Sequence, residues 1–306
     1  MLTGCTVSRF DTEGAELGSA TDTARMIELA NTPADIRFTK IIAADWVVDR
    51  AGLINLEHEH AIEQGLTEGD EPIQISFYAI EHPERGTFWI DSGVSTLFRD
   101  EDTMPVSSII ASQMNFGALD VHVDTADWIE REGEPDGVFL THAHLDHIMG
   151  LPDLPADVPV YFGPGELETR AFINMFVRRT TNRLIGRERE IYEWEMRGDP
   201  SEEFAGLIDV FGDETVFAIH VPGHTAGSVA FLVRTQEGPQ LILGDSSHTN
   251  WGWNHCVEPG EFSEDIDVSA ESLRNLKHLE AMLPELAVHL GHQHHEPDAS
   301  ASGCVH

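Results

Sequence analysis

Basic residues are scarce in this chain of 306 residues: 18 Lys and Arg stand against 54 Asp and Glu, and Lys40 and Lys277 are the only lysines. The formal net charge of −36 repels phosphate backbones, so nucleic acid is not expected as a partner except through a local basic patch. A surface rich in carboxylates also keeps a protein dispersed, including in strong salt. We therefore interpret the acidity first as a means of solvation.

Long apolar runs are missing as well. The segments 73–80 and 216–233 are hydrophobic, but they are short or interrupted by polar residues. A membrane-spanning helix needs ~18 or more consecutive apolar residues. We therefore expect no transmembrane segment and a cytoplasmic protein.

Cysteine is rare too, since Cys5, Cys256 and Cys304 are the only three and lie far apart in sequence. This spacing supports neither a disulfide framework nor a zinc ribbon, and it predicts reduced thiols. Residues 2–5, with the sequence LTGC, have the form of a bacterial lipoprotein cleavage box but lack the apolar segment that should precede it. A lipid-anchored or exported form is expected only if that box is truncated.

Strand-like and helix-like patterns alternate along most of the chain. Residues 1–35 predict a flexible N-terminal lead-in with one short helix near 22–30, residues 36–293 a single layered domain, and residues 294–306 a short tail. Strands are predicted at 36–48, 73–80, 87–90, 137–140, 158–162, 216–221, 228–233, 240–243 and 287–290. Helices are predicted at 106–114, 125–132, 165–184 and 269–283, the third being the longest. This order fits an α/β fold with β-sheets and helices outside them.

The strand predicted at 137–140 leads into residues 141–147, with the sequence THAHLDH. His142 and His144 can share one metal ion, because alternate residues of an extended segment point the same way. Asp146 and His147, where the chain turns into a helix, can face a second ion. Four potential ligands within six residues form a specific signal for metal binding.

Three more candidate ligands each follow a predicted strand and a glycine: His224, Asp245 and His292. A glycine suits a tight turn that aims the next side chain at the edge of a sheet. His294 and His295 lie close to His292 but do not follow the strand and glycine directly, so we prefer His292. Seven ligands match two metal sites, in which imidazoles leave a position for water and a carboxylate can bridge.

This set, after the Asp-Ser-Gly turn at 91–93, resembles the metallo-β-lactamase superfamily over about residues 36–293. The resemblance implies a four-layer αβ/βα sandwich of two β-sheets, with the metals at one edge. It also implies a division of the seven ligands: His142, His144 and His224 for the first ion, Asp146, His147 and His292 for the second, and Asp245 as the bridge. Asp91 would orient a ligand imidazole without touching the metal.

Such a site predicts hydrolysis. Two divalent metal ions, expected to be Zn²⁺ with Fe, Mn or Co as alternatives, lower the pKa of a bridging water toward about 7 and polarise the carbonyl that the resulting hydroxide attacks. No serine or cysteine nucleophile is then required. Asp146 is predicted to act both as a ligand and as the catalytic carboxylate that carries a proton to the leaving oxygen.

Differences between this sequence and known branches of the superfamily restrict the expected substrate class. Asp245 stands where the commonest zinc β-lactamases have a cysteine, which disfavours penicillin hydrolysis. Glyoxalase II enzymes carry a glutathione-binding region after the last ligand, whereas only 14 residues follow His292 here. The RNA-processing branch needs a cationic surface, which the net charge argues against.

The remaining branch looks like the N-acyl homoserine lactonases and similar hydrolases of small-molecule esters and lactones. Those lactonases have a tyrosine three residues after the bridging aspartate, where it contacts the substrate carbonyl. His248 holds that position here and is predicted as a catalytic residue that donates a similar hydrogen bond. The alternatives are a glyoxalase II-like thioesterase and a non-hydrolytic mononuclear iron oxygenase of the same fold. Whether the chain forms a homodimer is left open.

Aromatic residues suggest a substrate pocket. Trp251 and Trp253 follow Asp245 and are predicted to wall the pocket, with ordinary packing of the loop as the alternative. Phe172 and Phe176 recur at helical spacing and are predicted pocket residues, although such stripes more often belong to a core.

Arginines are concentrated in one stretch of 20 residues: Arg170, Arg178, Arg179, Arg183, Arg187 and Arg189. A solvated helix balanced by neighbouring glutamates, namely Glu166, Glu168, Glu188 and Glu190, accounts for most of this pattern. It is also the one place in the sequence that suits an anionic group of a ligand.

Overall fold

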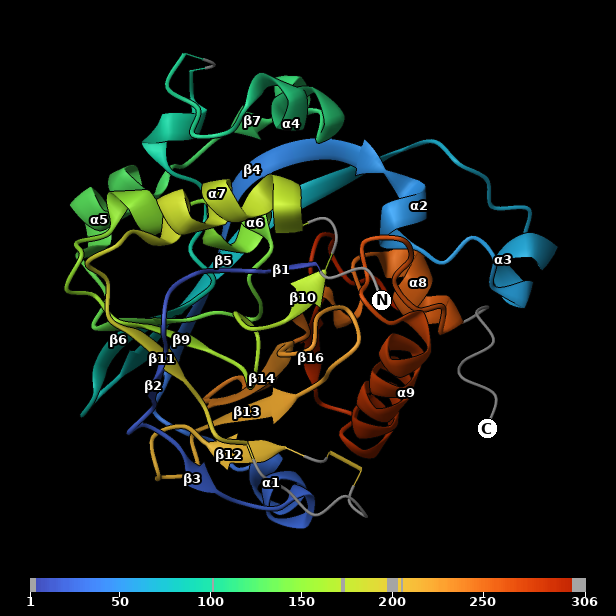
Figure 1. Ribbon diagram of the computed structural model, residues 1–306. Coiled ribbons are helices and arrows are strands. Elements are labelled where there is room, and N and C mark those ends of the chain that lie inside the picture. The colour runs from blue at the N-terminus through green and yellow to red at the C-terminus, as the bar shows by residue number, and fades with distance from the viewer. Residues whose placement is uncertain (1–3, 101, 172–173, 197–202, 205, 299–306) are drawn as a thin grey trace. The chain divides into compact units, whose positions relative to one another are not determined.

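The computed structural model describes residues 4–100, 102–171, 174–196, 203–204 and 206–298 (Figure 1). Its contacts divide the chain into two compact units that are interleaved in sequence. Unit 1 comprises Met1–Ala15, Arg37–Val48 and Pro72–Trp194; unit 2 comprises Glu16–Ile36, Asp49–Glu71 and Glu195–His306. Each unit has its own sheet and helices, and the single layered domain expected over 36–293 stays a prediction.

Unit 1 is built on a mixed sheet. In the described part of the chain it has eight strands in the order β2-β11-β9-β8-β6-β5-β4-β7. These are β2 (Glu13–Gly14), β11 (Ile191–Glu193), β9 (Val160–Phe162), β8 (Gly137–Phe139), β6 (Gly86–Ile90), β5 (Asp70–His82), β4 (Arg37–Asp49) and β7 (Asp120–Val121). The strands from β2 to β6 run parallel, whereas β6 pairs antiparallel with β5 across the turn at 83–85. Parallel strands are buried on both faces, which explains why β8 and β9 are short apolar runs.

The helices of unit 1 lie beside this sheet (Figure 1). They are α4 (Ser108–Gln113), α5 (Thr125–Glu132), α6 (Leu145–Ile148) and α7 (Asn174–Ile185), with short 3₁₀ turns η1 (Thr96–Phe98), η2 (Phe116–Ala118) and η3 (Leu151–Asp153). A two-stranded pair of β1 (Cys5–Thr6) and β10 (Arg170–Ala171) completes the unit. The helix predicted at 165–184 is confirmed over its second part, where α7 lies. Its predicted start is wrong, because turns and β10 occupy residues 164–171.

A half-buried guanidinium, that of Arg189, connects the segment after α6 with the segment after α7. Arg189 donates to the carbonyl oxygens of Leu151, Leu154, Pro155, Val158 and Ile185 at 2.8–3.1 Å. Burial lowers the pKa of Arg189 to about 10. Five carbonyl acceptors compensate the loss of water around this cation.

Unit 2 is built on a second mixed sheet, six-stranded within the described residues, in the order β16-β15-β14-β13-β12-β3. Its strands are β3 (Ser19–Ala20), β12 (Leu207–Asp209), β13 (Val216–His220), β14 (Val229–Thr235), β15 (Gly238–Ile242) and β16 (Ala287–His289). Neighbours pair antiparallel except β15 and β16, which run parallel. Every residue of the central strand β14 is buried.

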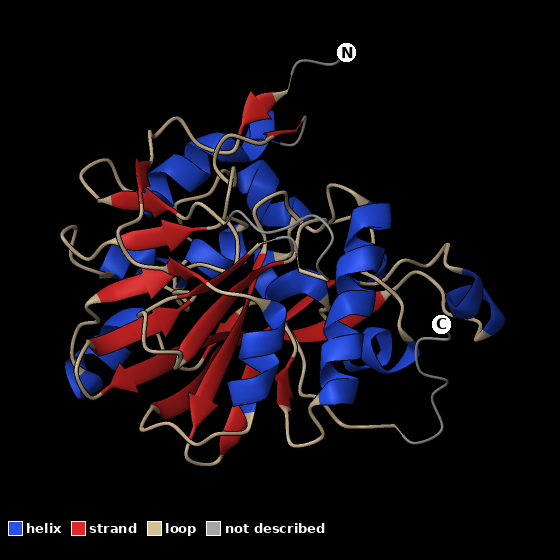
Figure 2. Ribbon diagram, turned by 90° about the horizontal axis from the view of Figure 1, so that it is seen from below, coloured by secondary structure: helices blue, strands red, loops and turns tan. Residues whose placement is uncertain are grey.

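The helices of unit 2 are α1 (Thr23–Ala30), α2 (Arg50–Leu53), α3 (Glu59–Glu63), α8 (Asn250–His255) and α9 (Ile266–Met282), with the 3₁₀ turn η4 (Gly244–Ser246). Leu273, Leu276 and Leu279 of α9 pack with Phe217 and Leu232 of the sheet in one hydrophobic core. Both units thus combine helices and strands. Figure 2 shows the helices of the structure in blue and its strands in red. The α/β fold class is confirmed, with two mixed sheets accompanied by helices.

The predicted loose lead-in is integrated into the fold from residue 4 onward. β2 pairs with β11, β3 pairs with β12, and Met26 of α1 lies in the core of unit 2. The predicted short helix near 22–30 is confirmed, and Asp22 caps it by accepting from Arg25 N at 2.8 Å. The description of 1–35 as a flexible lead-in is therefore wrong for its described residues.

Two smaller expectations from composition can be compared with the structure. Cys5 is a free thiol, whereas Cys256 is disulfide-bonded, so the expectation of reduced thiols is wrong for Cys256. Among the described residues, no helix combines the length and the apolar character that crossing a bilayer requires.

Candidate metal centre

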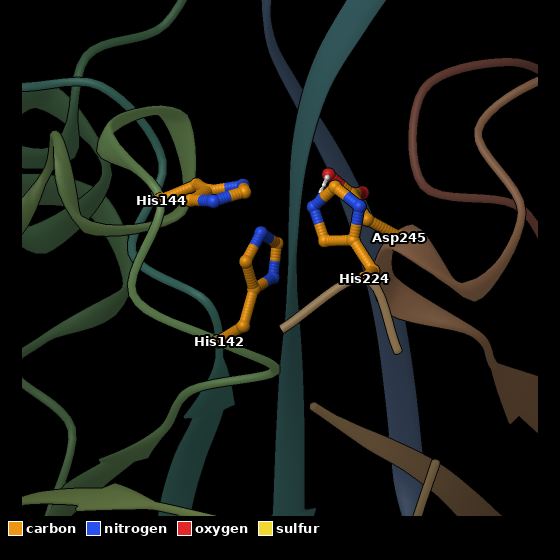
Figure 3. A group of neighbouring side chains, drawn as sticks. All are labelled: His142, His144, His224 and Asp245. Carbon is orange, nitrogen blue, oxygen red and sulfur yellow. Dashed lines mark ion pairs between the residues drawn. The ribbon is translucent and has the colours of Figure 1, made fainter. Parts of the chain in front are cut away.

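In unit 1 four predicted ligands lie on the loop that connects β8 with α6. His142 follows β8, His144 is the N-cap residue of α6, and Asp146 and His147 lie within α6. The ring of His142 lies 4.6 Å from that of His144 and 4.1 Å from that of His147, measured between centroids. Figure 3 shows His142 and His144 as neighbours on this loop. The sequence pattern thus brings three imidazoles together within unit 1.

Asp91 supports this loop from β6. Its backbone has a positive φ of 61°, which a non-glycine residue adopts only at some cost. Its carboxylate accepts from Thr141 N at 2.9 Å and from the Thr141 hydroxyl at 3.0 Å, and it lies 2.8 Å from His147 Nδ1. Because a carboxylate can only accept, Nδ1 of His147 carries the proton and Nε2 keeps the lone pair that a metal needs.

Sequence reasoning missed a second carboxylate behind the same loop. Glu166 is 1% exposed, and its Oε1 accepts from Ala143 N, between His142 and His144, at 2.6 Å. This contact holds the backbone of the loop in its extended shape. No spacing in the sequence indicates it, because Glu166 is 23 residues away and looks like one of several surface glutamates.

In unit 2 two of the other predicted ligands, His224 and His292, flank the carboxylate of the third, Asp245. His224 Nε2 lies 3.4 Å from Asp245 Oδ2, and His292 Nε2 lies 3.4 Å from Asp245 Oδ1. All three side chains are almost completely buried. Figure 3 draws His224 beside Asp245, joined by a dashed line. Each oxygen of Asp245 therefore faces a different imidazole.

The glycines before these ligands have two different causes. Gly223 and Gly244 have positive φ of 129° and 51°, as tight turns require. Gly291 does not, but a Cβ there would lie 2.4 Å from Asp245 Oδ1. Gly291 is thus required for close approach to the carboxylate and not for a left-handed turn.

His248 takes a third place beside Asp245. Its Nδ1 donates to the carbonyl oxygen of Leu53 at 2.9 Å, and its Nε2 lies 3.2 Å from Asp245 Oδ2. The ring stacks on that of His292, with 5.5 Å between centroids, and it is 1% exposed. In this arrangement Nε2 faces a carboxylate oxygen. Hydrogen-bond donation from His248 to a substrate stays a prediction.

The structure places the predicted pocket residues in different surroundings. Trp253 has no exposed surface, belongs to the hydrophobic core of unit 2 and donates to Glu280 at 3.1 Å, so its prediction as a pocket wall is wrong. Trp251 is partly exposed and stacks on His255, and its place in the pocket stays a prediction. Phe176 is 57% exposed on α7, and its pocket role also stays a prediction. Phe172 lies outside the described residues.

The chemistry of the donors fits divalent metal ions. Unit 1 supplies three imidazoles and one carboxylate of the predicted set, and unit 2 supplies two imidazoles and one carboxylate. Imidazole nitrogen with carboxylate oxygen suits Zn²⁺, Co²⁺, Fe²⁺ and Mn²⁺ better than the harder Mg²⁺ or Ca²⁺. The proton on His147 Nδ1 leaves the opposite nitrogen of that ring available, as ligation requires.

Residues 71–292 match the family model of the metallo-beta-lactamase superfamily. The match covers well over half of the chain, and the chain belongs to this superfamily. The resemblance predicted from the histidine and aspartate motifs is therefore confirmed.

Characterised relatives include lactamases and lactonases. The chain is 23% identical over 231 residues to the gamma-lactamase FDB1 of Fusarium pseudograminearum, a match that covers 70% of this chain and 54% of FDB1. It is 25% identical over 238 residues to the N-acyl homoserine lactonase AttM of Rhizobium johnstonii, which covers 71% of this chain and 82% of AttM. The chain thus spans about half the length of the first relative and most of the second.

Solved structures show the same fold. A quorum-quenching N-acyl homoserine lactone lactonase superposes with a TM-score of 0.62 at 17% identity, covering 86% of this chain and 93% of the other. AidC, described as a dizinc quorum-quenching lactonase, superposes with a TM-score of 0.54 at 12% identity, covering 85% and 88%. At these identities the likeness concerns the fold alone.

Proposed function

We propose that this protein is a dinuclear metal-dependent hydrolase of lactones or related esters. One ion would be held by His142, His144, His224 and Asp245, and the other by Asp146, His147, Asp245 and His292. The observation that carries the proposal is the surrounding of Asp245. One of its oxygens faces an imidazole of the first set, and the other faces an imidazole of the second set. A carboxylate placed in this way suits a bridge between two cations.

When bound, such cations lower the pKa of water and polarise a substrate carbonyl. Other residues of the chain would orient the ligand imidazoles. Asp91 fixes the ring of His147 through Nδ1. Ser263 supports the ring of His224, because its hydroxyl oxygen lies 3.3 Å from His224 Nδ1. Asp146 is less buried than its neighbours, which suits the proposed transfer of a proton to the leaving oxygen.

The substrate class follows from the relatives and remains a proposal. Several of them are N-acyl homoserine lactonases, which favours a lactone ring with an acylamino group. Two are gamma-lactamases, which favours a second candidate, the amide bond of a γ-lactam. Both reactions attack a carbonyl in a five-membered ring, so one site can be tested for both. We propose Zn²⁺ as the metal and a small molecule as the partner. The proposed location is the cytoplasm or, if residues 2–5 belong to a lipoprotein cleavage box, an exported and lipid-anchored form.

The test is a hydrolysis screen of protein reconstituted with Zn²⁺, Co²⁺ or Mn²⁺. Substrates would be acyl homoserine lactones, simple γ-lactones, a γ-lactam, aryl esters and a thioester. Asp245→Ala should abolish turnover of the best substrate, because it removes the bridging carboxylate. Asp267→Ala, which removes an exposed carboxylate at the start of α9, is the matched control.

Equal turnover by wild type and Asp245→Ala on every substrate would refute the hydrolase. Metal counting on the same samples separates the alternatives. Two equivalents per chain support the dinuclear site, whereas a single tightly bound iron without hydrolysis would support the oxygenase instead.

A further inference from the structure

Helix α7 has an exposed face of unusual composition for this chain. Met175 and Phe176 are 55% and 57% exposed, and Arg179 and Arg183 follow at helical spacing and are exposed as well. The opposite side of the helix is buried through Thr180, Thr181, Leu184 and Ile185. Residues spaced by three, four or seven positions share one side of a helix, so the two apolar side chains and the arginines form a single stripe. We call this stripe the α7 face.

The arginines of α7 form no ion pair with any acidic side chain in the part of the chain that the structure describes. The helix carries Arg178, Arg179 and Arg183 and no acidic residue, in a protein whose net charge is −36. Within the described residues none of these three takes part in an ion pair, although acidic residues outnumber basic ones threefold. The balancing glutamates expected from the sequence do not serve them. Glu166, for example, is buried on the backbone of Ala143.

The cleavage-box cysteine lies against the beginning of the same helix. β1, which contains Cys5, pairs with β10 immediately before α7, and Asn174 Nδ2 donates to the carbonyl oxygen of Cys5 at 3.2 Å. β1 and α7 are in direct contact (Figure 1). A lipid attached at Cys5 would therefore place the α7 face close to the membrane surface. One acyl chain alone holds a protein only marginally, and a basic patch is the usual second signal.

We propose that the α7 face docks on an anionic lipid surface. The guanidinium groups of Arg179 and Arg183 would pair with phosphodiester headgroups, and Met175 would enter the boundary between headgroups and acyl chains. The strongly acidic remainder of the protein opposes this approach. Its effect falls off within about 8 Å at physiological ionic strength, so the groups at the contact decide the outcome.

The experiment measures co-sedimentation of the full-length protein with vesicles of phosphatidylcholine alone or with phosphatidylglycerol added. We expect binding to the anionic vesicles, weakening with salt. The double variant Arg179→Gln/Arg183→Gln should reduce the partition coefficient roughly tenfold or more, from the usual contribution of a basic residue at a charged surface. Met175→Ser should weaken it further. Phe176 is left unchanged in all variants, because it is also a predicted pocket residue.

The matched control is Arg131→Gln/Arg274→Gln, which changes the net charge equally but alters two exposed arginines on α5 and α9. An equal loss in the control would overturn the proposal, since net charge and not the α7 face would then govern binding. Equal binding to both kinds of vesicle would overturn it as well. So would absence of vesicle binding together with a change in oligomeric state in the α7 variant, which would make the face an interface between two copies.

Discussion

Replacing Asp91 by Asn should weaken metal binding without removing a proposed ligand. The carboxylate of Asp91 is 3% exposed and serves both Thr141 and His147. Asn keeps the size of the side chain and tolerates the positive φ of this position as Asp does, so the substitution adds no backbone strain. One oxygen becomes an NH₂ group, which can only donate. If that group faces His147 Nδ1, the ring must move its proton to Nε2, the atom proposed to bind the metal.

The magnitude follows from this change of tautomer. Loss of a partner that orients a ligand imidazole typically costs ten- to hundredfold in metal affinity, or about 1.4 to 2.7 kcal/mol. His147 belongs to only one of the two proposed ligand sets. The loss should therefore fall on one metal equivalent and leave the other nearly unchanged.

The assay is competition for Zn²⁺ against a chromophoric chelator, with thermal unfolding followed in parallel to show that the variant is folded. Asp267→Asn, at an exposed position, is the control. Unchanged affinity for both equivalents in a folded Asp91→Asn protein would refute the role of Asp91. An equal loss on both equivalents would refute the assignment of His147 to a single ion.

Three further predictions concern stability and the geometry of the site. Arg189→Met leaves five carbonyl oxygens without their donor and should lower the free energy of unfolding, measured in urea, by at least ~3 kcal/mol. A decrease of less than ~1 kcal/mol would contradict the stabilising role of Arg189. Burial lowers the pKa of His220, so the unfolded state binds more protons below about pH 6.5 and the folded state loses stability as pH falls through that window. His220→Gln, which can still donate to Ala226, should therefore lose less stability than wild type between pH 7.5 and 5, and parallel pH profiles would contradict this. Gly291→Ala places a Cβ 2.4 Å from Asp245 Oδ1 and should reduce bound metal by dialysis and metal analysis, while a normal metal content would show that the loop can move aside.

The sequence predicts most of the sheet strands, because apolar runs and alternation mark the faces that the core covers. It does not predict β1, β2 and β3, since each is two residues long and is defined only by a partner more than 150 positions away. Dependence on distant partners also explains why residues 1–35 were wrongly predicted to be a flexible lead-in. Their sequence has only a weak hydrophobic pattern, and it does not show which distant strands pair with them.

The sequence likewise predicts some residues of the candidate site and not others. The ligand motif is visible because four donors stand within six residues, and the glycines mark the other three. Trp251 and Trp253 look equivalent in sequence, but they lie in the short helix α8, where two positions correspond to a rotation of about 200°. One ring therefore remains partly exposed and the other enters the core. Glu166 was missed because its partner is a backbone N–H, which no side-chain pattern reveals.

The interleaving of the two units restricts how this protein can be divided. The chain passes from one unit to the other after Ala15, Ile36, Val48, Glu71 and Trp194. No continuous stretch of the gene encodes either unit alone, so neither can be produced by simple truncation or exchanged as a cassette between homologues. Random recombination within the family should yield viable chimeras only when both parents contribute matching segments to the same sheet, a constraint that library design can apply from the outset.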